Sequence, residues 1–427
     1  MRDAVHTPSE AGQGLESLRL AGLRRRTLSL LATGQILGGL GMGASLSVGA
    51  LAASELAGEA WSGLAATMMT LGAGAVAVPL ARLADRRGRR ISLSTAALVA
   101  AAGAAACILG ISAGSVLILF VGLGLTGAAA AGGLQSRFAA TDLASARSRG
   151  RDLSLVVWST TVGAVTGPNL AQPGEVLGAA LGLPQLAGVF VFPIASQLLA
   201  AATYMILMRP DPLLESRRIL AAAAQATSGP PGARPPTAGD RLLVRVAIGT
   251  IALSHATMVA LMSMTPIHLV HGGATLTVVG LTISLHIAGM YGLSPVFGVL
   301  SDRLGRLPTV LLGQALLVAS ALTTAMGAHH TRVVMLGLIM LGLGWSAATV
   351  AGSALLGDAA PPALRVRLQG RSDLVMNLAG ALGGALAGPA LALLGYGGLA
   401  WLLLLPVAAV SGAAIWGLGR ARRVPAG

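Results

Sequence analysis

Two histidines, His255 and His286, lie inside long apolar stretches of the sequence. Imidazole has an ordinary pKa of about 6.5, so it gains and loses a proton close to neutral pH. An ionisable group within an apolar helix is costly to bury and marks a functional site by default. Both histidines are therefore candidates for proton uptake and release. The alternative is that each is neutral, hydrogen-bonded and part of a cavity wall.

Two methionines accompany the first of these histidines. Met258 and Met262 follow His255 and are separated from each other by about one helical turn. Imidazole and thioether groups are ligands for soft or borderline metals. Methionine also fills adaptable apolar walls without binding anything. The sequence leaves open a metal as cargo, and it predicts no resident metal ion.

Further polar residues interrupt the apolar stretches. Such groups hydrogen-bond a ligand at the interface between structural repeats, or they bridge two helices. A cavity wall built from such apolar stretches suits a neutral or weakly charged amphipathic molecule. A sugar phosphate or a dicarboxylate would need buried arginines. Besides the two histidines, the candidates for this wall are Gln35, Asn169, Tyr291 and Asn377.

A short charged segment occurs twice, each time between two apolar stretches. Its first copy contains Asp85, Arg86, Gly88, Arg89 and Arg90, and its second contains Gly298, Asp302, Arg303, Gly305 and Arg306. Glycine allows a tight turn, and we call each copy a hinge.

The carboxylates of the hinges, Asp85 above all, can meet the positive N-terminal end of a neighbouring helix or an arginine. A contact of this kind that forms only when two halves of a protein close is a latch. The alternative for the arginines is that they fix topology and bind anionic lipid headgroups.

A second motif is also repeated. Asp152 leads into a stretch with Gly163, Gly167 and Pro168, and Asp373 leads into one with Gly384, Gly388 and Pro389, with the same spacing from aspartate to proline. The glycines and prolines predict close helix packing and a bend that shapes a cavity. The two aspartates have two possible roles: each caps its helix, or each forms an ion pair between the two halves.

Composition decides the class of protein that must position these residues. Hydrophobic residues make up 54% of the chain and charged residues only 10%, whereas about 25% is usual in soluble domains. The apolar runs are long and poor in aromatic residues, which favours membrane helices over a membrane β-barrel. The single cysteine, Cys107, cannot form a disulfide within the chain.

Twelve stretches are long and apolar enough to cross a membrane. They cover residues 27–53, 62–80, 91–110, 114–136, 153–174, 186–208, 243–265, 276–296, 308–327, 333–356, 374–395 and 399–418.

The arginines cluster on alternate connections, so the positive-inside rule predicts that both termini lie in the cytoplasm. The predicted organisation is an N-terminal tail (1–26), a six-helix bundle (27–208), a cytoplasmic linker (209–241), a second six-helix bundle (242–418) and a C-terminal tail (419–427).

The twin hinges and the six-plus-six plan resemble the major facilitator superfamily of secondary transporters. The match at the first hinge includes Asp85, Arg86, Gly88, Arg89 and Arg90, with Ala81 in place of the usual leading glycine. Within that superfamily the glycines before Pro168 look like the signature of drug/proton antiporters. Those exporters carry an arginine in the fourth helix, and the stretch from Leu119 to Ala131 has none.

The resemblance implies an all-α membrane protein of two pseudo-symmetric halves that works by alternating access. We expect efflux of hydrophobic or amphipathic compounds across the cell membrane, coupled to protons. The expected partners are a small-molecule substrate, protons and the lipid bilayer, with no nucleic acid, no cofactor and no second copy of the chain. No nucleotide-binding loop and no enzymatic cluster occurs in the sequence. The alternatives are a metal-ion or small-metabolite transporter, and a membrane sensor that transports nothing.

Overall fold

The computed structural model describes residues 8–58, 61–145, 147–226 and 238–421. The first part of the chain forms α1 (Pro8–Ala57), α2 (Ser62–Arg87), α3 (Arg89–Ser112), α4 (Val116–Ala139), α5 (Arg149–Thr166), η2 (Gly167–Leu170), α6 (Ala171–Ala180), η3 (Ala187–Phe190), α7 (Val191–Ala202), η4 (Thr203–Leu207) and α8 (Pro212–Ala226). The second part forms α9 (Ala238–His271), α10 (Leu276–Tyr291), α11 (Ser294–Leu304), α12 (Arg306–Met326), α13 (Thr331–Ala359), α14 (Arg365–Leu402) and α15 (Leu404–Ala421).

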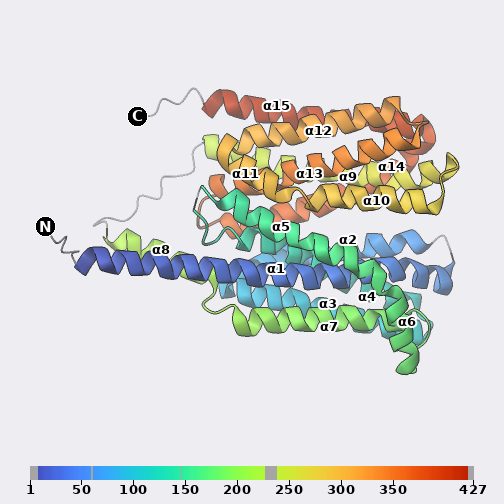
Figure 1. Ribbon diagram of the computed structural model, residues 1–427, viewed down its shortest axis with the longest axis horizontal. Coiled ribbons are helices and arrows are strands. Elements are labelled where there is room, and N and C mark those ends of the chain that lie inside the picture. Colours follow the sequence, from blue (N-terminus) through green and yellow to red (C-terminus); the bar gives the residue numbers. More distant parts are fainter. Residues whose placement is uncertain (1–7, 59–60, 146, 227–237, 422–427) are drawn as a thin grey trace, which may run out of the picture.

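The helices form two bundles that lie side by side along the long axis of the molecule (Figure 1). We call α1–α7 the N-terminal bundle and α9–α15 the C-terminal bundle. The bundles meet chiefly where α2 packs on α14 and α5 packs on α11. The start of α1 and the end of α15 lie at the same end of the molecule (Figure 1).

Both hinges are tight turns between consecutive helices. Gly88 joins α2 to α3 with φ 88°, and Gly305 joins α11 to α12 with φ 102°. A side chain with a Cβ rarely adopts this left-handed backbone, so glycine is the residue that such a turn requires. We call the end of the molecule that holds both turns the hinge end.

The helices of the described part include ten segments that are long and apolar enough to cross a membrane. One of the ten, Arg365–Leu418, is 54 residues long and contains the last two predicted stretches. It breaks at Gly395, whose φ of 69° is not helical. The fifth predicted stretch is divided among α5, η2 and α6 and is not one of the ten. The exact number of crossings stays a prediction.

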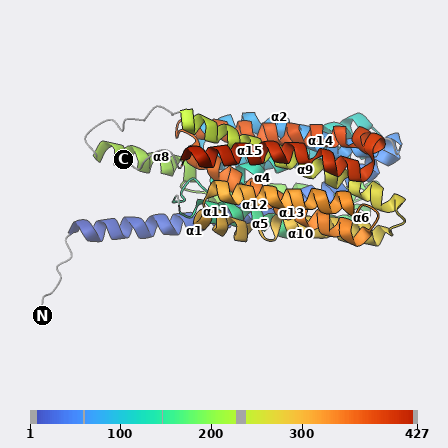
Figure 2. The ribbon, with the colours of Figure 1, turned by 90° about the horizontal axis from the view of Figure 1, so that it is seen from above.

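Helices continue beyond the predicted bundle boundaries at the hinge end. The helix α1 begins at Pro8 and passes through the predicted boundary at residue 26, and α8 lies within the predicted linker. Both project beyond the bundles (Figure 2). The proline-rich centre of the linker, residues 228–236, lies outside the described residues, as does most of the predicted C-terminal tail.

Candidate functional site

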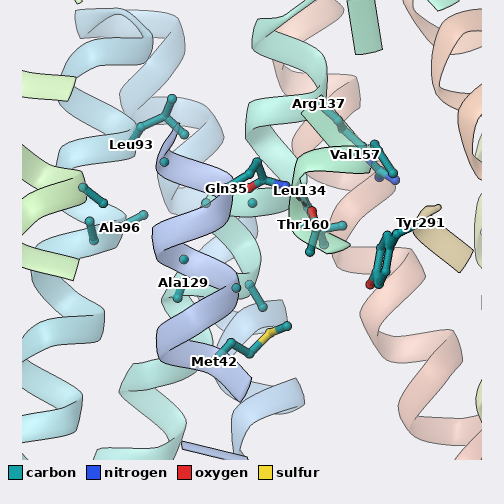
Figure 3. A pocket seen from close by; sticks show the side chains of 18 of the residues that line it. Gln35, Met42, Leu93, Ala96, Ala129, Leu134, Arg137, Val157, Thr160 and Tyr291 are labelled. Atoms are coloured by element: carbon teal, nitrogen blue, oxygen red, sulfur yellow. Dashed lines mark hydrogen bonds between the residues drawn. The ribbon is translucent and has the colours of Figure 1, made fainter. Parts of the chain in front are cut away.

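A cavity of about 200 Å³, which we call the central cavity, lies between the bundles (Figure 3). The N-terminal bundle lines it with residues of α1, α3, α4, α5 and α7, and the C-terminal bundle lines it with residues of α9, α10, α13 and α14. Most of its wall is apolar or glycine, as the composition predicts. A ligand in this position would touch both halves of the protein.

Two of the predicted polar residues contribute amide groups to the wall. Gln35 on α1 donates from Nε2 to Oγ1 of Thr160 on α5 at 2.9 Å, and both lie near the middle of the view in Figure 3. Asn377 on α14 also lines the cavity and donates to the backbone oxygen of Asp373 at 2.8 Å. Each amide therefore has a hydrogen-bond partner and keeps donor or acceptor capacity for a ligand.

The C-terminal bundle adds an aromatic cluster. His255 on α9 accepts a hydrogen bond at Nδ1 from Nε1 of Trp345 at 3.1 Å. The ring of Tyr291 lies edge-on to Trp345, with 5.8 Å between centroids. Because Nδ1 is an acceptor, this imidazole is neutral and carries its proton on Nε2. His255, Tyr291 and Trp345 all line the cavity.

Two other predicted wall residues lie elsewhere. His286 is fully buried, and its Nδ1 lies 2.8 Å from the backbone oxygen of Leu338 on α13. Its side chain points at the neighbouring helix because α10 turns that face away from the central cavity. Asn169, in η2, is exposed and donates to the backbone oxygen of Val165 in the preceding turn. The sequence did place both in apolar segments, but it could not say which face of a helix each occupies.

The wall also contains a residue that sequence reasoning missed. Arg137 lies in the last turn of α4, is 2% exposed, and donates from Nη2 to Oδ1 of Asp373 at 2.7 Å. Asp373 is 1% exposed and lies within α14, so this ion pair joins the two bundles. The predicted fourth stretch ends one residue too early to include Arg137. The apolar residues Phe138-Ala139-Ala140 that follow it are the signal that could have placed this arginine inside the helix.

The two hinge carboxylates join the bundles in different ways. Asp302 accepts hydrogen bonds from the backbone N–H groups of Gly150 and Arg151, both at 2.8 Å, at the N-terminal end of α5. Asp85 instead accepts from side chains, from Arg367 of α14 at 3.1 Å and from Arg217 of α8 at 2.5 Å. Across the bundles, Asp302 therefore contacts a helix terminus and Asp85 contacts an arginine, which are the two types of contact that the sequence allows. Within its own bundle Asp302 is also paired with Arg306.

A layer of charged residues lies beside these contacts, and it is buried at Arg89 and Asp142 but partly exposed at Asp358. Arg89, only 1% exposed, is paired with Asp142 at 2.8 Å and donates to the side chain of Gln369 in α14, also at 2.8 Å. Arg149 and Arg306 both pair with Asp358. The arginines of the hinges thus differ in role, since Arg86 and Arg303 are exposed.

Burial shifts the pKa of two groups of this layer. It raises the pKa of the Asp142 carboxyl, against the opposing effect of Arg89. Burial, together with the nearby cations Arg365 and Arg306, lowers the pKa of Arg149 to about 10. Arg149 is therefore still a cation at neutral pH.

Glycines make the closest approaches between the bundles. A Cβ added to Gly298 of α11 would lie 2.6 Å from the backbone oxygen of Gly150 in α5. At the other crossing, a Cβ on Gly370 of α14 would collide with the side chain of Ala81 in α2. The leading glycine that the first hinge lacks is thus compensated by a glycine on the helix that faces it.

The repeated motif of α5 and α14 is not symmetric in its packing. A Cβ on Gly163 would lie 2.7 Å from Leu40 of α1, and one on Gly167 would lie 2.8 Å from the backbone oxygen of the same residue. In α14, by contrast, nothing lies within 4 Å of such a Cβ on Gly388, and the nearest atom to one on Gly384 is at 3.4 Å. Close packing of α14 on α9 occurs earlier, at Gly383.

The rest of the motif also differs between the copies. Pro168 lies in the 3-10 turn η2, whereas Pro389 lies inside α14. Asp152 pairs with Arg24 of its own bundle at 2.5 Å. Asp373 pairs instead with Arg137 of the opposite half, which lies within the last turn of α4 and not in one of the connections between helices.

The described residues contain no group of three or more His, Cys, Asp or Glu side chains arranged to hold a metal ion. His255 and His286 do not share the cavity, so they cannot act together on one ion there.

Comparison with known proteins decides the family. The sequence model of the Major Facilitator Superfamily matches residues 246–426. The uncharacterized MFS-type transporter YdeG of Bacillus subtilis (strain 168) is 37% identical over 407 residues, which cover 93% of both proteins. The chain belongs to the major facilitator superfamily. It is therefore a multi-pass membrane transporter of this superfamily rather than an enzyme.

Two further matches show how widely the superfamily fold is shared. The riboflavin transporter RfnT of Brucella anthropi is 31% identical over 391 residues, or 90% of this chain and 94% of that protein. The solved structure of the proton:xylose symporter XylE, bound to 6-bromo-6-deoxy-D-glucose, matches with a TM-score of 0.71 at 17% identity and covers 95% of this chain and 96% of that one. The second match establishes the fold of the superfamily and not a substrate.

Proposed function

We propose that this protein exports a small amphipathic molecule across the cytoplasmic membrane by alternating access. The central cavity, lined by both bundles and bounded at the hinge end by inter-bundle contacts, is the observation that carries the proposal. In the described conformation Asp85, Asp302 and the Arg137–Asp373 pair hold the hinge end closed. Substrate would reach the cytoplasm only after these contacts break.

The proposed arrangement has two six-helix halves, residues 27–208 and 242–418, joined by the linker 209–241. Both termini and the hinge end face the cytoplasm, since the arginines cluster there. A single chain forms the complete cavity, so a monomer suffices. Small movements at the glycine crossings would let the halves rock against each other.

The proposed driving force is the proton gradient, and His255 is the proposed site of proton exchange. Its imidazole lines the cavity, where Nδ1 accepts a hydrogen bond from Trp345 and Nε2 lies on the side of Gly380 of α14. Replacement of His255 by Asn keeps a polar group of similar size but removes the titration. We expect His255→Asn to leave exchange between equal substrate pools intact and to abolish accumulation that depends on a pH gradient.

The test is substrate flux in proteoliposomes with and without an imposed pH gradient, over a panel of lipophilic cations, neutral antibiotics, aromatic acids and divalent metals. Flux of an amphipathic compound supports the proposal. Flux of metals alone would favour the metal-ion alternative, and no flux with intact ligand binding would favour a sensor.

A flavin is a second candidate substrate. RfnT, whose name gives riboflavin as its cargo, is 31% identical to this chain, and the aromatic rings of Tyr291 and Trp345 could pack against a planar heterocycle. Uptake or export of riboflavin in the same vesicles tests this directly, with vesicles that lack the protein as the control.

A further inference from the structure

The central cavity has one charged group in its wall. Of the described residues that line it, Arg137 alone carries a full charge, and the other polar members are amides, hydroxyls, a phenol, an indole and the neutral His255. The guanidinium lies over the ring of Phe138, with 4.8 Å between its central carbon and the ring centroid. In Figure 3 the side chain of Arg137 extends from α4 toward the side of the cavity where Tyr291 lies.

The hydrogen bonding of this arginine is incomplete. A guanidinium has five N–H donors. Nη2 of Arg137 contacts Oδ1 of Asp373 and, more weakly, the sulfur of Met376 at 3.7 Å, but its buried Nε has no partner among the described residues. Oδ2 of Asp373 is equally buried and also lacks a partner there. A bidentate arginine–carboxylate pair would satisfy these atoms, and the geometry does not provide one.

The two partners differ in their access to the cavity. Arg137 is part of the wall, whereas Asp373 is not, although the next turn of its helix contributes Met376 and Asn377 to the wall. A ligand therefore meets the cation directly and the carboxylate only through it. Because Nε is buried, the side chain would have to turn toward the cavity before an acidic group took Nε and the Nη2 donor together, with the fork geometry that arginine offers to a carboxylate.

We propose that the substrate is an organic anion with one acidic group, and that this group binds Arg137 in competition with Asp373. One arginine neutralises one negative charge, so a dianion would leave a charge uncompensated in an apolar wall. The aromatic residues Tyr291 and Trp345 favour an apolar or aromatic body. This inference rests on the proposed transport function, for which it names the substrate class.

If Arg137 exchanges Asp373 for the ligand, binding in the cavity would also weaken the contacts that close the hinge end. Along α14, Arg367 contacts Asp85, Gln369 contacts Arg89, and Asp373 contacts Arg137. All three contacts join one helix of the C-terminal bundle to the N-terminal bundle. When the ligand takes Arg137, Asp373 loses its partner and takes up a proton from solution, since a buried carboxylate without a cation is costly. Helix α14 then loses the contact nearest the cavity, so the remaining two are easier to break.

The experiment compares acids with their amides. Thermal unfolding of the full-length protein in detergent is followed with aromatic carboxylates of one to three rings, such as naphthalene-2-carboxylate, and with the matching carboxamides. Because a hydrogen bond between charged groups is stronger than one to a neutral amide, we expect at least one carboxylate to bind roughly tenfold or more tightly than its amide. If no carboxylate in the series exceeds its amide, the proposal is wrong.

Substitutions at the Arg137–Asp373 pair test whether this pair causes the preference for carboxylates over amides. Arg137→Gln should remove the preference for the acid, Arg137→Lys should keep part of it, and Arg218→Gln, which removes an exposed arginine of α8, should keep all of it. Asp373→Asn removes the competitor and should tighten binding of the acid severalfold without changing the amide. Should Arg137→Gln fail to fold, the Asp373→Asn result decides, because unchanged or weaker binding of the acid contradicts the competition.

A labelling measurement tests the link to the hinge end. Cys107 is fully buried, so a cysteine introduced in place of Ser154, at the contact between α5 and α11, reports on opening with little background. The bound carboxylate should raise the rate of maleimide labelling severalfold, and should not do so after Arg137→Gln. Equal rates with and without the acid would overturn the coupling.

The two proposals can fail separately. Binding of the acid that depends on Arg137, without flux in proteoliposomes, would leave the anion site intact and refute transport. Flux of neutral compounds that is unaffected by Arg137→Gln would refute the anion site and leave transport intact.

Discussion

At the scale of single residues, the two hinge carboxylates illustrate how one motif makes two kinds of contact. Asp302 is 8% exposed in its side chain and is held by backbone N–H groups of α5. Asp85 is 15% exposed and depends on two arginine side chains. The sequence predicts that both carboxylates join helices, and it cannot tell which partner each finds, since that depends on the angle at which the opposite bundle arrives.

Asp85→Asn tests the latch. Asparagine keeps the size of the side chain but loses the charge that Arg367 and Arg217 share, and exposed pairs of this kind are worth at most about 1 kcal/mol each. We therefore expect flux to fall roughly fivefold while insertion and thermal stability stay near those of the wild type. Glu215→Gln, which removes an acidic residue of α8, is the matched control. Normal flux in Asp85→Asn would contradict the latch.

Asp142→Asn tests the buried pair with Arg89. Removal of one partner of a buried ion pair leaves the other charge uncompensated, which typically lowers stability by about 3–5 kcal/mol. The expected result is a marked drop in the thermal unfolding temperature, beyond any change seen for the partly exposed Glu215 in Glu215→Gln. An unfolding temperature equal to that of the wild type would mean that Arg89 finds a substitute acceptor.

The direction in which a polar side chain points is the feature that the sequence does not predict. Gln35, Asn377, Tyr291 and His255 were predicted in a cavity wall, and the structure places them in one. His286 has the same sequence context and faces another helix instead. An apolar stretch shows that a polar residue is within a membrane helix, but the uniform Ala, Leu and Gly around it give no periodicity from which to read its direction.

At the scale of helices, the crossings between bundles depend on glycine. The α5–α11 crossing brings Gly150 and Gly298 into direct contact, which leaves no space for a side chain on either. Such small-residue contacts let two helices approach closely and separate again without the interlocking of larger side chains.

Gly298→Ala tests this crossing. The added methyl group would lie too close to the backbone oxygen of Gly150, and backbone cannot move aside as a flexible side chain does. We expect the hinge end to close poorly, so that flux falls and the cysteine at position 154 labels faster without substrate. Gly280→Ala in α10 is the control, because nothing lies within 4 Å of its added Cβ. Similar effects of the two substitutions would point to a general change in helix propensity.

The helices themselves were largely predictable. The two turns at Gly88 and Gly305 lie where the hinges predict them, because a glycine next to charged residues interrupts an otherwise apolar pattern. The break at Gly395 has no such charged signal, yet it falls at the last residue of the predicted stretch 374–395, next to the predicted connection to 399–418. The glycines of α5 and α14 pack differently, because Gly163 and Gly167 approach α1 closely whereas in α14 the close approach to α9 is made by Gly383.

At the scale of the whole molecule, the sequence supports a defined orientation. The hinge end carries most of the arginines, and the connection between α12 and α13 lies at the opposite end and carries exposed histidines. A cysteine in place of the exposed Arg303 should therefore be protected in intact cells from a membrane-impermeant maleimide. A cysteine in place of His329 should react. Permeabilised cells should label both, and the reverse pattern in intact cells would invert the proposed topology.

The repeated plan of two bundles was evident from the twin hinges, and membership of the superfamily confirms it. The substrate could not be predicted from the sequence, because it depends on which side chains meet across the two halves. The sequence predicts an uncharged cavity wall, while the fold brings Arg137 into it from the last turn of α4. Contacts between residues more than two hundred positions apart decide the chemistry of the cavity.

The unequal partners of Asp85 and Asp302 imply that the two latches respond differently to the ionic strength of the solution. Side chains of Arg367 and Arg217 are 61% and 39% exposed, so mobile ions can screen their attraction to Asp85. The backbone amides of α5 that hold Asp302 carry no net charge, so mobile ions have a weaker attraction to screen there. Concentrated salt would thus loosen the α2–α14 side of the closed end before the α5–α11 side, and the protein would open unevenly.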